Sequence, residues 1–409
     1  MGPDVDVSDP GPTDFESDVA IIGGCGRVGL PLGIALAHRG QRTVLVDSSS
    51  ESVDSLTHGV LPFLEDGAQD LLDKGIRTGR LRATTDPGAV ARAEHVIVVI
   101  GTPVDEHLNP DPHAISQVIA EYRDQFRDGQ VLILRSTVYP GVTAMVERLM
   151  AELALDIHVA FCPERIAEGR AMVELYTLPQ IVASRSAIGR KKAELLFRTL
   201  TDKVVNVEPE EAELAKLFTN TWRYIKFATA NQLFMMANDF GLDFERVRTA
   251  IAYEYPRAAD LPAAGFAAGP CLLKDTMQLA AFSNNNFVLG HAAMLVNEGL
   301  PLYLVAQLEQ QYDLTTMRVG ILGMAFKAES DDTRSSLSYK LRRILRFKAA
   351  EVLCTDPYVT GDPRIRPLDE VVEQSDLLII GAPHAAYADI EPVVPIVDVW
   401  NLLGQGVRV

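Results

Sequence analysis

A cysteine at position 271 stands in a loop of small residues and is followed closely by a cation and a carboxylate. The segment over residues 265–275 has the sequence GFAAGPCLLKD. A lone cysteine in a soluble chain is usually a small buried hydrophobe. A positive charge nearby, however, favours the thiolate, which is the nucleophilic form of the side chain. The composition of this loop therefore indicates a reactive thiol at Cys271.

A lysine and an asparagine are spaced by four residues in an apolar stretch that we expect to be helical. At this spacing, Lys216 and Asn220 project from one face of a helix. Two donors aimed at one oxygen stabilise the negative charge that develops during acyl chemistry. A single helix lysine is more often only solvated, so the weight of this pair depends on the motifs around it.

A glycine-rich turn near the N-terminus has the GxGxxG pattern of dinucleotide-binding proteins. The sequence GCGRVG follows an apolar run at 18–23 and precedes a helical stretch. We expect Gly24 at the tight turn, Gly26 where the backbone approaches a pyrophosphate, and Gly29 where helix and strand pack closely. The helix N-terminus adds free N–H groups for that anion.

Asp47 ends the next apolar run, at the distance where an acidic residue accepts hydrogen bonds from the adenosine ribose. Three serines follow it, and no arginine is placed for a 2′-phosphate, which favours NAD over NADP. A hydride acceptor and a nucleophilic thiol in one chain predict an oxidation that passes through a covalent intermediate.

Two sets of short apolar runs predict the elements that position these residues. The runs of the first set lie at 18–23, 43–47, 95–100, 131–134 and 157–161, and those of the second at 318–323, 351–357 and 375–384. Runs of this kind, alternating with helical stretches, are typical of parallel sheets. The second set lacks a complete glycine fingerprint, so we expect it to bind another part of the ligands. Between the sets, residues 208–240 predict one long helix.

The sequence thus predicts an α/β fold with two Rossmann-like doubly wound parallel-sheet domains, joined by a long central helix and a helical dimerisation region. The expected parts are a disordered acidic tail at 1–16, an NAD-binding domain at 17–205, a helical region with the cysteine loop at 206–312 and a second Rossmann-like domain at 313–409. The long helix is so apolar that we expect it to be buried between domains or in a homodimer.

Composition narrows the function classes. The chain has 409 residues and a formal net charge of −17, which argues against nucleic acid as a partner but not against a small anionic substrate. We find no apolar run of the roughly 20 residues that a membrane span needs. Four cysteines are too few for a disulfide scaffold, and no Cys/His spacing resembles a metal site. We expect reduced thiols, no metal, no membrane association and a cytoplasmic location.

Further segments share a pattern with the cysteine loop. They are GTP at 101–103, STVYPG at 136–141, CPERIAEG at 162–169, AELAKLFTN at 212–220 and MAFKAESDDTR at 324–334. In this order they resemble the nucleotide-sugar 6-dehydrogenases, along nearly everything after the N-terminal tail. That family includes the UDP-glucose, GDP-mannose, UDP-N-acetylmannosamine and UDP-N-acetylglucosamine dehydrogenases. The resemblance implies oxidation of a sugar 6-hydroxyl to a carboxylate in two NAD-dependent steps.

The resemblance also implies catalytic roles. Cys271 matches the nucleophile that captures the C6 aldehyde as a thiohemiacetal, which the second oxidation turns into a thioester for hydrolysis. Lys216 and Asn220 match residues that stabilise the oxygen as charge develops. Asp275 matches a carboxylate that manages protons and water, and Glu164 matches the acid/base of thioester hydrolysis.

Other matches are to binding positions. On the cofactor side they are Gly24, Gly26, Arg27, Val28, Gly29, Asp47, Thr102, Thr137, Glu168 and Arg334. On the substrate side they are Arg165, Arg257, Gly265, Phe266 and Lys327. Arg257 matches an arginine that family dimers lend to the neighbouring subunit, and arginine offers a planar set of donors that suits a diphosphate. The alternative for Arg334 is a surface ion pair with Asp331 or Asp332.

The sugar and the reaction class have alternatives. PER at 163–165 resembles the N-acetylhexosamine branch, whereas GPCLLKD at 269–275 resembles the glucose enzymes. We favour a UDP-N-acetylhexosamine, with UDP-glucose as the alternative. A single-step hydroxyacid dehydrogenase shares the layout but needs no thiol. A non-enzymatic NAD-sensing protein would not need the whole catalytic set.

Overall fold

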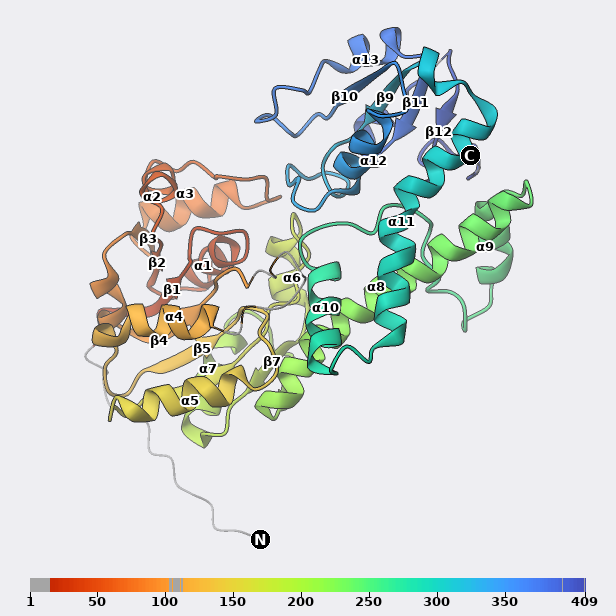
Figure 1. The fold of residues 1–409 in the computed structure, drawn as a ribbon. Helices are drawn as coiled ribbons and strands as arrows, with labels where there is room; N and C mark the ends of the chain where they lie inside the picture. Colours follow the sequence, from red (N-terminus) through yellow and green to blue (C-terminus); the bar gives the residue numbers. More distant parts are fainter. Residues whose placement is uncertain (1–14, 103–104, 106–110, 112, 392, 408) are drawn as a thin grey trace. The chain divides into compact units, whose positions relative to one another are not determined.

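In a computed structural model of the chain, residues 15–102, 105, 111, 113–391, 393–407 and 409 are described. They form two compact units (Figure 1), and the boundary between the units falls between Lys216 and Leu217. The expected divisions at 205–206 and 312–313 stay predictions. The expected acidic tail lies outside the described residues, apart from its last two.

The first unit is built on an eight-stranded sheet. The strands are β1 (Ser17–Ile22), β2 (Thr43–Val46), β3 (Leu81–Thr84), β4 (Ala93–Val98), β5 (Val131–Leu134), β6 (His158–Phe161), β7 (Gln180–Ala183) and β8 (Val204–Val207). Their order is β3-β2-β1-β4-β5-β6-β7-β8, and the first six follow the Rossmann order. The expected parallel pairing is confirmed from β3 to β6.

The pairing of β6 with β7 is antiparallel, which the sequence analysis did not predict. The helices of the first unit are α1 (Gly29–His38), α2 (Ser50–Thr57), α3 (Gln69–Arg77), α4 (Ala114–Glu121), α5 (Val142–Glu152), α6 (Ala171–Thr177) and α7 (Ala187–Arg198), with 3-10 turns at Pro87–Arg92 and Arg123–Gln125. The chain returns to the sheet through residues 162–179, which include the short α6, and re-enters it in the opposite direction.

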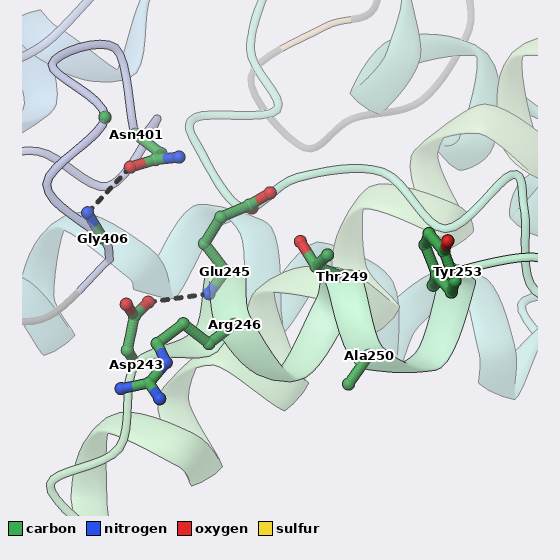
Figure 2. A pocket seen from close by; sticks show the side chains of 9 residues that line it. Asp243, Glu245, Arg246, Thr249, Ala250, Tyr253, Asn401 and Gly406 are labelled. Atoms are coloured by element: carbon green, nitrogen blue, oxygen red, sulfur yellow. Dashed lines mark hydrogen bonds between the residues drawn. The ribbon is translucent and has the colours of Figure 1, made fainter.

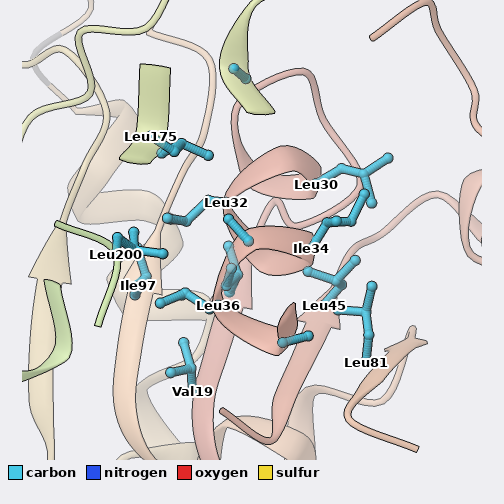
Figure 3. Packing of buried hydrophobic residues seen from close by; sticks show 14 of the residues in the cluster. Val19, Leu30, Leu32, Ile34, Leu36, Leu45, Leu81, Ile97, Leu175 and Leu200 are labelled. Carbon is cyan, nitrogen blue, oxygen red and sulfur yellow. The ribbon is translucent and has the colours of Figure 1, made fainter. Parts of the chain in front are cut away.

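The core of the first unit lies on both faces of this sheet. Val19 and Ile21 of β1 pack in one cluster, and Ala20 and Ile22 pack in another, because successive strand residues point to opposite faces. Figure 3 shows the leucine and isoleucine side chains of α1 packed against β1, β2 and β4 in the first of these clusters. This packing holds the start of α1 beside the ends of β1 and β2, where the glycine turn lies.

The second unit contains helices and a smaller parallel sheet of the order β10-β9-β11-β12. Its strands are β9 (Arg318–Leu322), β10 (Glu351–Thr355), β11 (Leu377–Ile380) and β12 (Ile396–Val397). Its helices are α9 (Phe244–Ala252), α10 (Leu272–Phe282), α11 (Val288–Gln311), α12 (Leu337–Leu345) and α13 (Leu368–Gln374), with 3-10 turns at Leu314–Thr316 and Ala385–Tyr387. Helix α12 packs on one face of this sheet and α13 on the other. The predicted second Rossmann-like fold is therefore confirmed.

One long helix, α8 (Pro209–Asp239), continues from the first unit into the second. Its first residue is a proline, which suits the start of a helix because the missing N–H would have no partner there. Gly241 follows its end with a φ of +68°, as is common after helix C-termini. The predicted long helix is confirmed.

Helix α11 is long and apolar enough, by length and composition alone, to cross a membrane. The statement of the sequence analysis that no apolar run reaches this length was therefore wrong for residues 288–311. Leu300, Leu304 and Leu308 of this helix pack in the core of the second unit, and Asn297 lies fully buried within it. A helix that packs in a protein core can have the same length and apolar composition, so these two properties are weak evidence for a membrane span.

Candidate active site

The glycine turn adopts the geometry that a dinucleotide site needs, but the tight turn lies at Gly23, one residue before the predicted Gly24. Gly23 has a φ of +74°, so it is the left-handed residue of the turn, a conformation that glycine adopts without strain. A Cβ on Gly24 would lie 2.8 Å from Leu45 Cα, and one on Gly29 would lie 2.6 Å from the Gly23 carbonyl oxygen. These two glycines allow close packing. Gly26 is exposed, and its nearest neighbour would be an ordinary 3.5 Å away.

Asp47 lies directly beside this turn. Its carboxylate accepts a hydrogen bond from the Cys25 N–H at 3.0 Å and another from the Ser49 N–H at 3.1 Å. The acid is therefore held at the end of β2, next to the start of α1, where a ribose hydroxyl would reach it. Val28 precedes the first residue of α1, so the turn ends at the helix N-terminus as predicted.

Other predicted cofactor residues of the first unit also meet each other. Arg27 forms an ion pair with Glu168 at 2.5 Å and lies over the ring of Phe63. The Thr102 hydroxyl donates to the Thr137 carbonyl oxygen at 2.7 Å. One contact joins the segments after β1 and β6, and the other joins the segments after β4 and β5. Both lie at the carboxyl ends of the strands, the edge where open α/β sheets bind ligands.

Substitution of Gly26 tests this site selectively. In Gly26→Ala we expect the KM for NAD to rise by about tenfold or more, because the new methyl group would stand where the backbone must approach the pyrophosphate. The fold should tolerate the methyl group, since it meets only an ordinary contact.

The control for this substitution is Gly24→Ala, whose methyl group would collide with β2 backbone. We expect that variant to lose about 1–3 kcal/mol of stability through overpacking. Thermal unfolding and NAD titration of both variants separate the two effects. Equal NAD affinity for Gly26→Ala and wild type would contradict the assignment.

Glu164 is buried in the first unit and its carboxylate is surrounded by donors. Arg135 donates to Oε2 from Nε at 3.0 Å and from Nη2, and the N–H groups of Arg165 and Ile166 donate to Oε1 at 2.7 and 3.1 Å. Arg135 is itself buried, and its guanidinium lies over the Phe197 ring. Sequence reasoning missed Arg135, although a cation directly after an apolar strand was a visible signal.

In the second unit, Cys271 is exposed and directly precedes α10. A helix N-terminus stabilises negative charge through its free N–H groups and its dipole. Asp275, one turn into α10, is fully buried. Asn220 of α8 donates to Asp275 Oδ2 at 2.5 Å, and the Lys274 ammonium pairs with Oδ1 at 2.7 Å. The structure thus brings three of the five predicted catalytic residues together, namely Cys271, Asn220 and Asp275.

The other two predicted catalytic residues belong to the first unit. Lys216 lies on α8 one turn before Asn220, which agrees with the predicted helical spacing. Glu164 lies in the turn after β6. Their roles stay predictions.

The cysteine loop has two glycines whose environment leaves no room for a side chain. Gly265 has a φ of +146°, and a Cβ there would lie 2.3 Å from the Trp400 ring. Gly269 has a φ of +102°, and a Cβ there would lie 2.7 Å from the Phe326 ring. Phe266 makes an edge contact with Trp400. Trp400 was missed from the sequence, where only its being one of two tryptophans marked it.

The contact with Phe326 connects the cysteine loop to the loop of Lys327. The Gly269 N–H donates to the Ser335 carbonyl oxygen at 3.3 Å, and Lys327 itself is half-buried. The predicted nucleophile and a predicted substrate lysine are therefore carried by two loops that touch.

Three of the predicted arginines form hydrogen bonds or ion pairs with residues of their own unit. Arg334 is exposed and pairs with Asp332 at 2.6 Å, which is the alternative weighed above. Arg257 is exposed, donates to the Tyr255 hydroxyl at 2.9 Å and lies over its ring. Arg165 donates to the Pro179 carbonyl oxygen, and burial lowers the pKa of its guanidinium. Ligand roles for these residues stay predictions.

An acid stands at the end of the second strand in both units. Asp356, which follows β10, accepts hydrogen bonds from the N–H groups of Met324 and Ala325 at 2.7 and 2.9 Å and lies 3.1 Å from Nε2 of the buried His384. Its carboxylate therefore fastens the loop after β9, as Asp47 fastens the turn after β1, and Asp356 has the buried histidine as an additional partner.

The four thiols differ in environment, which predicts selective labelling. None of the four, all of which lie in the described part of the chain, forms a disulfide, and only Cys271 is exposed. Burial raises the pKa of Cys25 and Cys162 to about 12 and that of Cys354 to about 11. Iodoacetamide at pH 8 should therefore label one residue of the folded protein, identified as Cys271 by peptide mass spectrometry, since the thiolate is the reactive form. Labelling of a second thiol at a similar rate would contradict this expectation.

A surface pocket of about 510 Å³ lies between α9 and the C-terminal segment (Figure 2). It is lined by Asp243, Glu245, Arg246, Thr249, Ala250, Tyr253, Asn401, Gly404 and Gly406. None of these is a predicted site residue, and Asp243 is occupied in capping α9 through the Glu245 N–H. The pocket therefore has no part in the predicted site. Among the described residues, no group of three or more His, Cys, Asp or Glu is arranged to hold a metal ion.

Comparisons with known proteins agree with this geometry. The UDP-N-acetyl-D-mannosamine dehydrogenase of Pyrococcus horikoshii is 28% identical over 403 residues, covering 95% of this chain and 93% of the relative. A solved UDP-D-ManNAc dehydrogenase from the same organism matches with a TM-score of 0.85 over 91% of both chains. A UDP-glucose dehydrogenase from Pyrobaculum islandicum, 25% identical, matches with a TM-score of 0.88 over 97% of both chains.

Three family models match consecutive parts of the chain. The NAD binding domain of the UDP-glucose/GDP-mannose dehydrogenase family matches residues 17–201, its central domain 210–298 and its UDP binding domain 320–405. With the dinucleotide turn in the first match and the cysteine loop in the second, the chain belongs to the UDP-glucose/GDP-mannose dehydrogenase family, whose reaction is an NAD-dependent oxidation of a nucleotide sugar.

Proposed function

We propose that this protein oxidises the C6 hydroxyl of a UDP-N-acetylhexosamine to a carboxylate in two steps through a thioester on Cys271. The observation that carries the proposal is the contact of Asn220 with the buried Asp275, one helical turn from the exposed thiol. The relatives named above, which include UDP-N-acetyl-D-mannosamine dehydrogenases, support the choice of sugar.

The residues suit each step of this chemistry. NAD, when bound, accepts one hydride in each of the two oxidations. The Cys271 sulfur adds to the C6 aldehyde carbon, and the oxygen that becomes negative needs donors, which Lys216 and Asn220 supply in the proposal. After the second oxidation, water adds to the thioester carbon and the C–S bond breaks, which returns the thiolate. Asp275 and Glu164 are the carboxylates proposed to move the protons of this hydrolysis.

The test is turnover of a panel of nucleotide sugars with excess NAD, counting NADH per sugar consumed. We expect two NADH per UDP-N-acetylhexosamine and a carboxylate product. If kcat/KM were highest on UDP-glucose, the substrate would be UDP-glucose, the alternative given in the sequence analysis. One NADH per sugar would indicate a single-step alcohol dehydrogenase, and NAD binding without turnover would indicate a sensing protein.

We further propose a homodimer formed through α8. Phe218 and Trp222 lie one turn apart on this helix and are both more than half exposed, so they form an apolar face that a second copy would cover. Light scattering should give the mass of a dimer, and Trp222→Asp should shift it toward the monomer. A monomeric wild type at assay concentration would overturn this proposal.

We also propose a cytoplasmic location. None of the four cysteines, all of them described, forms a disulfide, and this supports the proposal, since reduced thiols are typical of that compartment. Recovery of the protein in the periplasmic or extracellular fraction of its cells would contradict the proposal.

A further inference from the structure

Two asparagines form a buried network that none of the predicted roles uses. Asn231 of α8 and Asn297 of α11 are 1% and 0% exposed. Asn231 Nδ2 donates to Asn297 Oδ1 at 2.9 Å, and Asn297 Nδ2 donates to the Tyr224 carbonyl oxygen at 3.1 Å. The pair thus connects two helices inside the core of the second unit, where each buried polar atom needs a partner.

The same amide holds the first residue of the cysteine loop. Asn231 Oδ1 accepts from the Gly265 N–H at 3.0 Å, and Nδ2 donates to the Gly265 carbonyl oxygen at 3.0 Å. One side chain therefore satisfies both backbone groups of Gly265. The Trp400 ring occupies the space that a side chain at position 265 would need. The ring is held in place by a hydrogen bond from its Nε1 to the Ile380 carbonyl oxygen at 3.1 Å.

These contacts fix the position of Gly265, the first residue of the cysteine loop. Residues 265–271 run from this clamp to the N-terminus of α10, with a second attachment at Gly269. A nucleophile must be held within a fraction of an ångström of its productive position, and groups that contact no substrate can supply that restraint. Buried, fully satisfied polar networks make such restraints rigid.

We propose that Asn231 and Asn297 are positioning residues that hold the cysteine loop in register for the attack of Cys271. The proposal rests on the proposed function and deepens it. Asn231 acts on the loop directly. Asn297 acts by orienting the Asn231 amide, so its removal leaves both bonds to Gly265 possible and should have the smaller effect.

The experiment compares Asn231→Leu and Asn297→Leu with the matched control Asn238→Leu. Asn238 lies on the same helix and is also buried, but its amide bonds to Tyr303 and Val409 rather than to the cysteine loop. All three variants should lose thermal stability. We expect Asn231→Leu to lower kcat at least tenfold more than the control, with NAD affinity unchanged, and Asn297→Leu to lie between them.

Hydrogen exchange supplies a readout that does not depend on activity. The peptide that contains Gly265 should take up deuterium faster in Asn231→Leu than in wild type or Asn238→Leu, because the N–H loses its acceptor. Unchanged uptake, or a kcat within twofold of the control, would overturn the proposal. A wild type that turns over no nucleotide sugar would overturn the proposed function, while the exchange result would still decide whether Asn231 holds the loop.

Discussion

Cys271→Ser is expected to stop after the first oxidation, giving no more than one NADH per sugar and no carboxylate. A serine hydroxyl is a far weaker nucleophile than a thiolate at neutral pH, so the aldehyde would not be captured for the second hydride transfer. The steady-state rate of carboxylate formation should fall by about three orders of magnitude or more, as is usual when a covalent nucleophile is removed.

NADH absorbance under single-turnover conditions gives the number of NADH per sugar, and mass spectrometry of the product formed with excess sugar gives the steady-state rate of carboxylate formation. The control is Cys354→Ala, which removes a buried thiol of β10 and should keep two NADH per sugar. If Cys271→Ser still released carboxylate at a wild-type rate, the thiol would be only a packing residue.

The second large effect is expected from Arg135→Met. The guanidinium pairs with the buried Glu164 and also donates to the Cys162 carbonyl oxygen at 2.9 Å and to Gln180 Oε1 at 3.1 Å. Methionine removes every donor and leaves a buried carboxylate without its cation. Breaking a buried pair in this way costs roughly 3–5 kcal/mol, so the first unit should be strongly destabilised.

Urea unfolding of three variants checks this expectation. Arg135→Lys should retain part of the stability, because an ammonium keeps the charge but not the paired geometry. The double variant Arg135→Met, Glu164→Met should be more stable than Arg135→Met alone, since no buried charge remains. A loss below about 1 kcal/mol in Arg135→Met would mean that water or another cation replaces the guanidinium.

The sequence predicted those parts of the molecule that follow from local patterns. Strands such as β1 and β9 are continuous apolar runs, and α8 is a long stretch of helix formers, so each could be placed from its own residues. The spacing of Lys216 and Asn220 depends only on helix geometry. The glycine turn was also predictable, although the left-handed residue is Gly23 rather than Gly24.

The parts that were missed depend on contacts between distant residues. Asn231 and Arg135 are polar residues in apolar segments, and only the fold shows that one meets Gly265 and the other meets Glu164. The antiparallel β7 was missed because its direction depends on the path of the chain over residues 162–179, not on the sequence of the strand itself. The pairing of Arg334 with Asp332 was one of two alternatives that charge alone could not separate.

The contact between Gly269 and Phe326 has a consequence for anyone who wishes to redesign the substrate range. The two loops fit each other so closely that a cysteine loop taken from a relative would meet an aromatic ring shaped for this one. Trp400 imposes the same constraint at Gly265. A successful chimera should therefore exchange residues 265–275, 324–335 and 400 as a single cassette, and libraries that vary one loop alone should be dominated by misfolded members.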